Sequence, residues 1–206
     1  MKFKKGFFMK RNLLMLCLAM ITLLSTGCVQ DVLPTITQSN SGNTTPPPIR
    51  NQQTATITYQ RLQTVQGPTL TVGIRPTGFT FPDFQGKIVL LEVFGKECHY
   101  CFEEMPTIHR LYSKYRQNLQ VISLQAQDPM SKATANNLIH RFNMNYPIVD
   151  KNHAIDLLYV LKSTYAWNGI LPFMLLIKNG VTEYSFRGQV NQKELEEAIQ
   201  MLIQTP

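Results

Sequence analysis

A continuous apolar run stands just before a pair of cysteines in this chain, and the two features together restrict the fold more than any others. Residues 87–94 (KIVLLEVF) form the run, and Cys98 and Cys101 follow it closely. A strand without polar alternation is typical of the centre of a sheet that is covered on both faces. Apolar residues at three- and four-residue steps over 103–118 then predict an amphipathic helix. The sequence therefore predicts a strand, a cysteine pair and a helix in immediate succession.

Strands and helices alternate over the rest of the chain. Residues 119–125 predict a second strand, 131–142 a helix capped by Ser131, 146–149 a short extended segment and 154–161 another helix. Residues 173–178 and 181–186 predict strands joined by the hairpin signal Asn179-Gly180, and Asn191 caps a last helix. Short strands are also expected between residues 54 and 74. Crossover helices make the early strands parallel and the hairpin makes the late pair antiparallel, so we expect an α/β fold with a central mixed sheet flanked by helices.

The formal net charge of +7 is concentrated at the N-terminus. Residues 1–27 hold five basic residues and no acidic one, which leaves about +2 for the rest of the chain. The charge therefore gives no case for a nucleic-acid partner. The apolar run from Leu13 to Leu24 has 12 residues, which is the length of a secretory signal peptide and too short to span a bilayer.

The leader ends on Ser25-Thr26-Gly27-Cys28, which resembles the bacterial lipobox. In that motif the cysteine is acylated and becomes the first residue of the mature protein. We therefore expect a lipoprotein signal peptide at residues 1–27 and lipidation at Cys28, which would anchor the protein in a membrane. Ordinary cleaved export and an uncleaved anchor remain alternatives. All three place the following domain outside the cytoplasm, on the periplasmic side in a Gram-negative cell.

Residues 28–53 have the composition of a spacer. They are rich in Ser, Thr, Asn, Gln and Pro and contain no aromatic residue. Such a segment buries too little apolar surface to offset the entropy lost on ordering. We expect a flexible linker here, between the lipid anchor and a folded domain at residues 54–206.

The number and spacing of the cysteines indicate a reactive pair rather than a framework of structural disulfides. Of the four cysteines, Cys17 lies in the leader and Cys28 is assigned to the lipid, so Cys98 and Cys101 are the thiols of the domain. A bridge between residues this close encloses almost no chain and adds little loop-closure entropy. Half of a zinc site and an inert bridge are the other interpretations, and a zinc site lacks a second cysteine pair in this sequence. We interpret the pair as a redox-active disulfide and expect no metal and no cofactor.

The position of the pair at the start of a helix assigns a role to each sulfur. Free N–H groups and the positive end of the helix dipole stabilise a thiolate there, and the thiolate is the nucleophile of disulfide exchange. We expect Cys98 to be exposed and acidic, and Cys101 to be covered and to act as the resolving thiol. His99 adds positive charge beside Cys98 and Glu97 opposes it, so the net effect of these two neighbours stays open.

Residues 86–106 (GKIVLLEVFGKECHYCFEEMP) resemble the active-site block of the thioredoxin superfamily. Glu104-Met105-Pro106 is similar to the TlpA/ResA/CcmG group of membrane-tethered thioredoxins, and so is the stretch YPIVD at residues 146–150. The resemblance covers roughly residues 79–203. It implies a thioredoxin fold with extra N-terminal strands and an inserted β-α element.

The same resemblance implies further site residues. The segment ILPF at 170–173 is similar to the family's cis-proline loop, in which the Leu171–Pro172 bond is cis, faces the cysteines and presents backbone groups to substrate. Glu92, six residues before Cys98, matches the buried carboxylate of thioredoxins, which has a raised pKa and accepts the proton of the resolving thiol. An edge position facing solvent is the alternative for Glu92. The expected catalytic residues are Cys98, Cys101, Glu92 and Pro172, and the expected substrate-binding residues are His99, Tyr100, Leu171 and Pro172.

Two positions depart from the family pattern. Glu97 stands where the family has tryptophan, and Tyr100 stands where it has proline, as in exported isomerases of the DsbC type. The resemblance implies a thiol–disulfide oxidoreductase that reduces exported proteins, with apocytochrome c as the leading substrate and a membrane reductase of the DsbD/CcdA kind as the electron donor. The alternatives are an isomerase or oxidase of exported proteins, and a copper metallochaperone that uses Cys98, Cys101 and a histidine.

Overall fold

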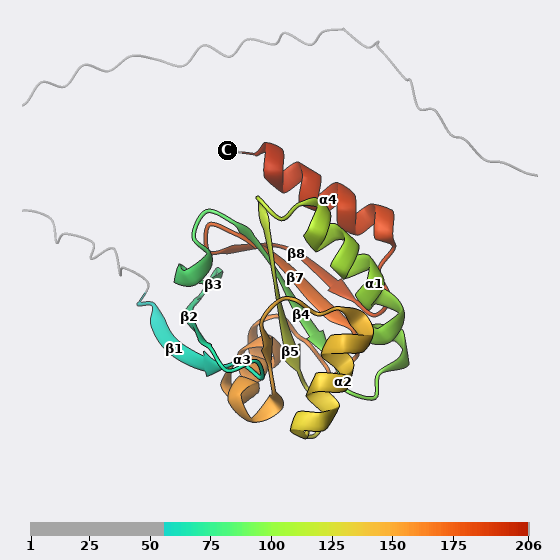
Figure 1. Cartoon of the computed structure of the whole chain (residues 1–206). Helices are drawn as coiled ribbons and strands as arrows, with labels where there is room; N and C mark the ends of the chain where they lie inside the picture. Colours follow the sequence, from blue (N-terminus) through green and yellow to red (C-terminus); the bar gives the residue numbers. More distant parts are fainter. Residues whose placement is uncertain (1–55, 206) are drawn as a thin grey trace, which may run out of the picture. The chain divides into compact units, whose positions relative to one another are not determined.

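A five-stranded mixed sheet forms the centre of the computed structural model, which describes residues 56–205 (Figure 1). The leader, Cys28 and the linker expected at 28–53 lie outside these residues. The strand order is β6-β5-β4-β7-β8. β4, β5 and β6 run parallel, β7 is antiparallel to β4, and β8 is antiparallel to β7. The strands are β4 (Ile88–Phe94), β5 (Leu119–Gln125), β6 (Ile148–Val149), β7 (Phe173–Lys178) and β8 (Val181–Arg187).

Both faces of this sheet are covered, which explains why every residue of β4 and β5 is buried. α1 (His99–Lys114), α2 (Lys132–Phe142) and α4 (Gln192–Gln204) pack on one face, where Leu90 and Phe94 point. α3 (Lys151–Thr164) packs on the other face, where Leu91 and Val93 point. Among residues 56–205, none of the helices has the length and apolar character needed to cross a membrane.

The N-terminal strands form a second, antiparallel sheet of three strands. Its strands are β1 (Thr58–Gln63), β2 (Thr69–Arg75) and β3 (Gly78–Thr80), and the short 3₁₀ helix η1 (Pro82–Phe84) leads from β3 into β4. Val65 N donates to Ile148 O at 2.8 Å, and Thr182 N donates to Thr77 O at 3.0 Å. These bonds join the small sheet to both edges of the large one. The expected thioredoxin architecture with extra N-terminal strands is therefore confirmed.

The helix limits differ from those that the apolar periodicity predicts. α1 begins at His99 instead of residue 103 and ends at Lys114 instead of 118. In its first turn His99 and Tyr100 are exposed and Cys101 is the residue that is fully buried, so the apolar repeat is weak there. At the other end, Asn118 N and Leu119 N both donate to Tyr115 O, which closes a turn before β5. α3 is likewise longer than residues 154–161, because its first and last turns are largely polar.

Replacing Gly78 by alanine is expected to lower the free energy of unfolding by about 3 kcal/mol, through backbone strain and overpacking. Gly78 has φ +155°, and a Cβ there would lie 2.7 Å from Thr182 N and 2.8 Å from Gly180 O, which are backbone atoms of the β7–β8 hairpin. Gly67→Ala is the matched control, because Gly67 also has a positive φ but has open space around the added Cβ. Urea denaturation measures both variants, and equal losses would contradict the close approach at Gly78.

Candidate active site

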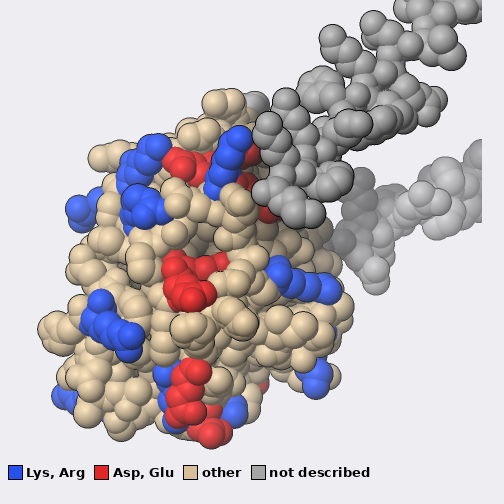
Figure 2. All heavy atoms as spheres, turned by 90° about the vertical axis from the view of Figure 1, so that its right-hand side faces the viewer, with Lys and Arg blue, Asp and Glu red and all other residues tan. Residues whose placement is uncertain are grey.

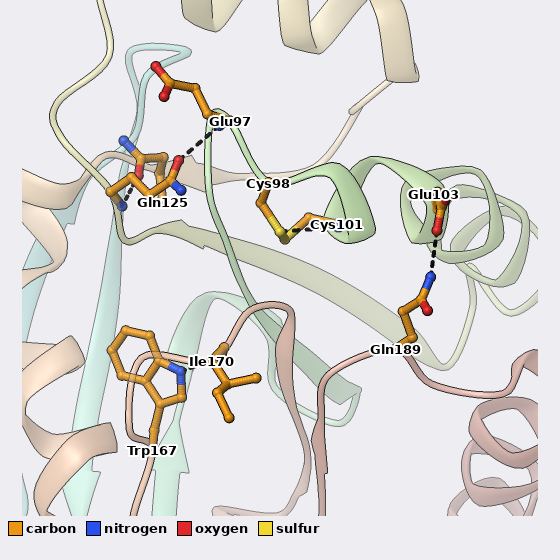
Figure 3. The surroundings of a disulfide bond; sticks show 9 residues. Glu97, Cys98, Cys101, Glu103, Gln125, Trp167, Ile170 and Gln189 are labelled. Carbon is orange, nitrogen blue, oxygen red and sulfur yellow. Dashed lines mark hydrogen bonds between the residues drawn. A yellow bond between two sulfur atoms is a disulfide. The ribbon is translucent and has the colours of Figure 1, made fainter.

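The two cysteines of the domain form a disulfide at the point where β4 gives way to α1 (Figure 3). The Cα atoms of Cys98 and Cys101 are 5.3 Å apart. Cys98 is the N-cap residue of α1, and its Sγ accepts a hydrogen bond from Cys101 N at 3.2 Å. A thiolate at this place has a backbone donor and the positive end of the helix dipole to stabilise it.

The two sulfurs differ in their access to solvent. Cys98 is half-buried, whereas Cys101 is fully buried in the core beneath α1. A partner can therefore reach Cys98 and not Cys101. This arrangement is able to supply an accessible nucleophile and a protected second thiol within one helical turn.

The charged side chains next to Cys98 largely engage each other. His99 Nε2 lies 3.1 Å from Glu103 Oε1, one turn along α1, and both side chains are exposed. Lys96 Nζ lies 4.0 Å from Glu97 Oε1, and the Glu97 side chain is 78% exposed. Exposed pairs such as these are screened by solvent and contribute little free energy. Figure 2 shows basic and acidic side chains interspersed over the face that looks to the right in Figure 1.

The expected cis-proline loop lies at the same end of the sheet as the cysteines. The Leu171–Pro172 bond is cis. Phe173, which follows it, stands opposite Val93 in the β4–β7 pair, close to the end of β4 that leads to Cys98. The structure therefore brings Cys98, Cys101, Leu171 and Pro172 together, although they come from two distant parts of the sequence.

An apolar rim lies beside the disulfide, and sequence reasoning assigned only part of it. Tyr100 is 55% exposed and Ile170 is 52% exposed. Trp167 Nε1 donates to Ile170 O at 2.8 Å, so the indole holds the loop before Pro172 (Figure 3). Trp167 was not expected at the site, because no periodicity or motif around it links it to the cysteines. Large side chains exposed at a rim are typical of a surface that binds another protein.

Glu92 is buried on the sheet face that carries Cys101, and the alternative of a solvent-facing edge residue is wrong. Its side chain is 0% exposed, and its Oε2 accepts a hydrogen bond from Ser123 Oγ, the neighbour in β5. Its Oε1 has no partner among the described residues. Burial raises the pKa of Glu92 to about 7; the charge of Glu104 acts in the same direction, and the Ser123 hydrogen bond opposes both. A carboxyl with such a pKa exchanges protons readily near neutral pH.

Glu104 is a second buried carboxyl, which we did not assign from the sequence except as part of a family motif. It lies three residues after Cys101 on the inner side of α1 and is 8% exposed. Its Oε1 accepts a hydrogen bond from Val190 N, and burial raises its pKa to about 7 against the effect of that bond. The available signal was its spacing, since the three- and four-residue steps through Cys101, Met105 and Ile108 place it next to the buried stripe.

The described part of the chain contains no group of three His, Cys, Asp or Glu side chains arranged to hold a metal ion. The nearest histidine to the cysteines in sequence, His99, pairs with Glu103 at the surface. The copper-binding alternative therefore has no preformed third ligand in this region.

Comparisons with known proteins show which family and fold the chain shares. Residues 66–184 match the model of the AhpC/TSA family. The thiol-disulfide oxidoreductase ResA of Bacillus thuringiensis subsp. konkukian is 28% identical over 124 residues, which are 58% of this chain and 66% of that protein. The ResA of Geobacillus kaustophilus is 26% identical over 121 residues, with the same coverage. The chain thus spans just under two thirds of the length of these relatives.

Solved structures share the fold. The putative thioredoxin of Neisseria meningitidis superposes with a TM-score of 0.55 at 18% identity, over 73% of this chain and 91% of that one. StoA of Bacillus subtilis gives 0.51 at 16% identity, over 69% and 97%. The exposed lipoprotein thioredoxin Etrx1 of Streptococcus pneumoniae gives 0.52 at 18% identity, over 70% and 100%. The resemblance to the thioredoxin superfamily and its ResA-like group is confirmed, and this chain belongs to the AhpC/TSA family.

Proposed function

We propose that this protein is an extracytoplasmic thiol–disulfide oxidoreductase that reduces disulfide bonds of exported proteins. One observation carries the proposal: an accessible Cys98 at the N-cap of α1 is bonded to a fully buried Cys101. The helix N-terminus favours the Cys98 thiolate, and the burial of Cys101 reserves it for the second step. The names of the ResA relatives support the same chemistry.

In the proposed reaction the reduced protein attacks through the Cys98 thiolate. Its electron pair forms a bond to one sulfur of the substrate disulfide, the substrate S–S bond breaks, and one substrate thiolate leaves. Cys101 then loses its proton and attacks Cys98 Sγ, which breaks the mixed disulfide and releases the second substrate thiolate. The substrate gains two electrons, and the protein ends with the Cys98–Cys101 disulfide.

The buried carboxyls and the proline loop have separate tasks in this reaction. We assign to Glu92 the proton of Cys101, because its pKa of about 7 and its place on the same side of the sheet suit a general base. Backbone groups of Leu171 and Pro172 pair with the substrate chain, while His99 and Tyr100 contact it from the other side of the disulfide. The exposed Tyr100 and Ile170 add apolar contact area.

The surroundings of the cysteines favour a reductase over an oxidase or isomerase. A strongly oxidising pair depends on a highly stabilised thiolate, whereas here two buried carboxyls lie close by, Glu92 on the sheet face that carries Cys101 and Glu104 three residues after Cys101 on α1. Negative charge opposes a second negative charge on sulfur, which destabilises the reduced form. We therefore expect a potential near the thioredoxin value of about −270 mV and far from the value of about −120 mV of a strong oxidant. Equilibration of the purified protein with glutathione or dithiothreitol buffers measures it, and a value near the oxidant would contradict the reductase.

The place of action and the partners follow from the leader and the family resemblance. A lipid on Cys28 would hold the domain at a membrane outside the cytoplasm, and a membrane reductase of the DsbD/CcdA kind would supply its electrons. Apocytochrome c is the leading substrate, since its C-x-x-C-H thiols must be reduced before haem attachment. A disulfide peptide with that motif should be reduced faster than a peptide of the same composition in scrambled order.

A further inference from the structure

The loop between β4 and Cys98 is held by a hydrogen bond to a side chain from the segment that follows β5. This loop, residues 95–97, carries Cys98 directly after it, and Cys98 N donates to Gly95 O at 3.1 Å. Glu97 N donates to Gln127 Oε1 at 2.8 Å, a bond drawn at the backbone of Glu97 in Figure 3. The exposed Glu97 side chain does not anchor the loop by packing, so this backbone bond is its lateral attachment.

Gln127 is itself fixed by a chain of hydrogen bonds that leads into the core. Gln127 N donates to Oε1 of Gln125, which is fully buried. Gln125 Nε2 donates to Asp128 O at 2.7 Å and to Asp150 Oδ1 at 3.1 Å. Asp150 also accepts from Met130 N at 3.1 Å, which ties down the end of the same loop. The backbone of Gln127 is thus held by the buried Gln125, and from that fixed point its side-chain amide reaches Glu97 N.

The backbone of Gly95 packs directly against the Gln127 amide. A Cβ on Gly95 would lie 2.5 Å from Cδ, 2.7 Å from Oε1 and 2.9 Å from Nε2 of Gln127. Gly95 is not among the residues with positive φ, so the need for glycine here comes from space and not from backbone conformation. Both partners of this contact, Gly95 and Gln127, can therefore be changed by substitution.

We propose that Gln127 is a positioning residue that keeps the Cys98 sulfur at the N-cap of α1 when the disulfide is open. This inference rests on the proposed thiol–disulfide chemistry. In the oxidised protein the S–S bond itself ties Cys98 to the helix. In the reduced protein that link is gone, and the Glu97–Gln127 bond limits the freedom of the loop, so that the thiolate stays in line with Cys101 N and the helix dipole.

The test compares Gln127→Met and Gln127→Ala with the unchanged protein. Methionine keeps the length of the side chain but removes the acceptor. We expect both variants to raise the pKa of Cys98 by at least about half a unit and to slow its alkylation at pH 7 by roughly threefold or more, because less thiolate is present. Neither variant changes a charged group around Cys98, so a change in the Cys98 pKa reports a change in the position of its sulfur. Those charged groups are Lys96, Glu97, His99, Glu103 and, beneath them, Glu92 and Glu104.

Gln189→Ala is the matched control. Gln189 Nε2 also donates to a residue next to the cysteines, but its acceptor is the Glu103 side chain on α1 and not the loop. We expect its Cys98 pKa to match that of the unchanged protein. An unaltered pKa in Gln127→Met, or an equal shift in Gln189→Ala, would overturn the inference.

A double substitution tests the contact itself. Gly95→Ala alone should displace the amide and raise the Cys98 pKa as Gln127→Ala does, whereas Gly95→Ala in the Gln127→Ala background should add little. Additive shifts would overturn the inference. Alkylation requires no protein substrate, so a protein that reduces no disulfide but shows these shifts would refute the proposed function and leave the role of Gln127 standing.

Discussion

Replacing Cys98 by serine is expected to abolish disulfide reduction, with a loss of at least about a thousandfold in an insulin reduction assay. The hydroxyl of serine does not ionise near neutral pH and forms no bond to sulfur in exchange, so the first step has no nucleophile. Cys101 does not substitute for it, because its side chain is fully buried on the inner side of the first turn of α1. The fold should persist, since a bridge between residues three apart encloses almost no chain.

Cys101→Ser is the matched control for this result. It keeps the attacking thiol and removes the resolving one, so the mixed disulfide with substrate should accumulate and be visible on a non-reducing gel. Cys98→Ser should give no such species. If Cys98→Ser retained activity, or if it formed the adduct in place of Cys101→Ser, the assignment of the two roles would be reversed or lost.

The protein is expected to lose about 3 kcal/mol of folding free energy through Glu92 alone as the pH rises from 4.5 to 8. In the unfolded chain the carboxyl ionises near its ordinary pKa of 4.5, whereas in the folded protein burial holds its pKa at about 7. Above pH 4.5, ionisation of Glu92 therefore lowers the free energy of the unfolded state before it lowers that of the folded state. The contribution of Glu92 is fully present below the unfolded pKa and is lost as the pH passes the folded pKa.

Glu92→Gln isolates this effect, because the amide does not titrate. We expect the difference between the free energies of unfolding of the variant and the unchanged protein to move by about 3 kcal/mol in favour of the variant between pH 4.5 and 8. Urea denaturation of the oxidised proteins at several pH values measures it, with both cysteines held in the disulfide so that they do not titrate. The exposed Glu97→Gln is the control, and should show no comparable trend. A flat difference curve for Glu92→Gln would show that the carboxylate is stabilised in the folded protein by a partner.

Local patterns in the sequence were sufficient for most of the elements and for the pairing of Cys98 with Cys101. The apolar run at β4 gave a strand buried on both faces, Ser131 and Asn191 capped the helices that they were expected to cap, and Asn179-Gly180 joined β7 to β8. These features depend on contacts a few residues apart, which periodicity and turn preferences record directly. The apolar periodicity missed the first turn of α1, because His99 and Tyr100 face solvent there and the fully buried residue is Cys101.

Contacts at the site between residues far apart in the sequence were visible only in the tertiary structure. Sequence spacing alone did not reveal that Glu104 is buried, that Trp167 supports the loop before Pro172, or that Gln127 reaches across to Glu97. Each of these contacts crosses from one strand end or helix to another, so its existence depends on strand order and register. The sequence by itself singled out the pair Cys98 and Cys101 and was the basis for proposing that the outer sulfur ionises. Only the assembled sheet determined what surrounds them, because burial and a partner's position are properties of the packed chain and not of any single segment.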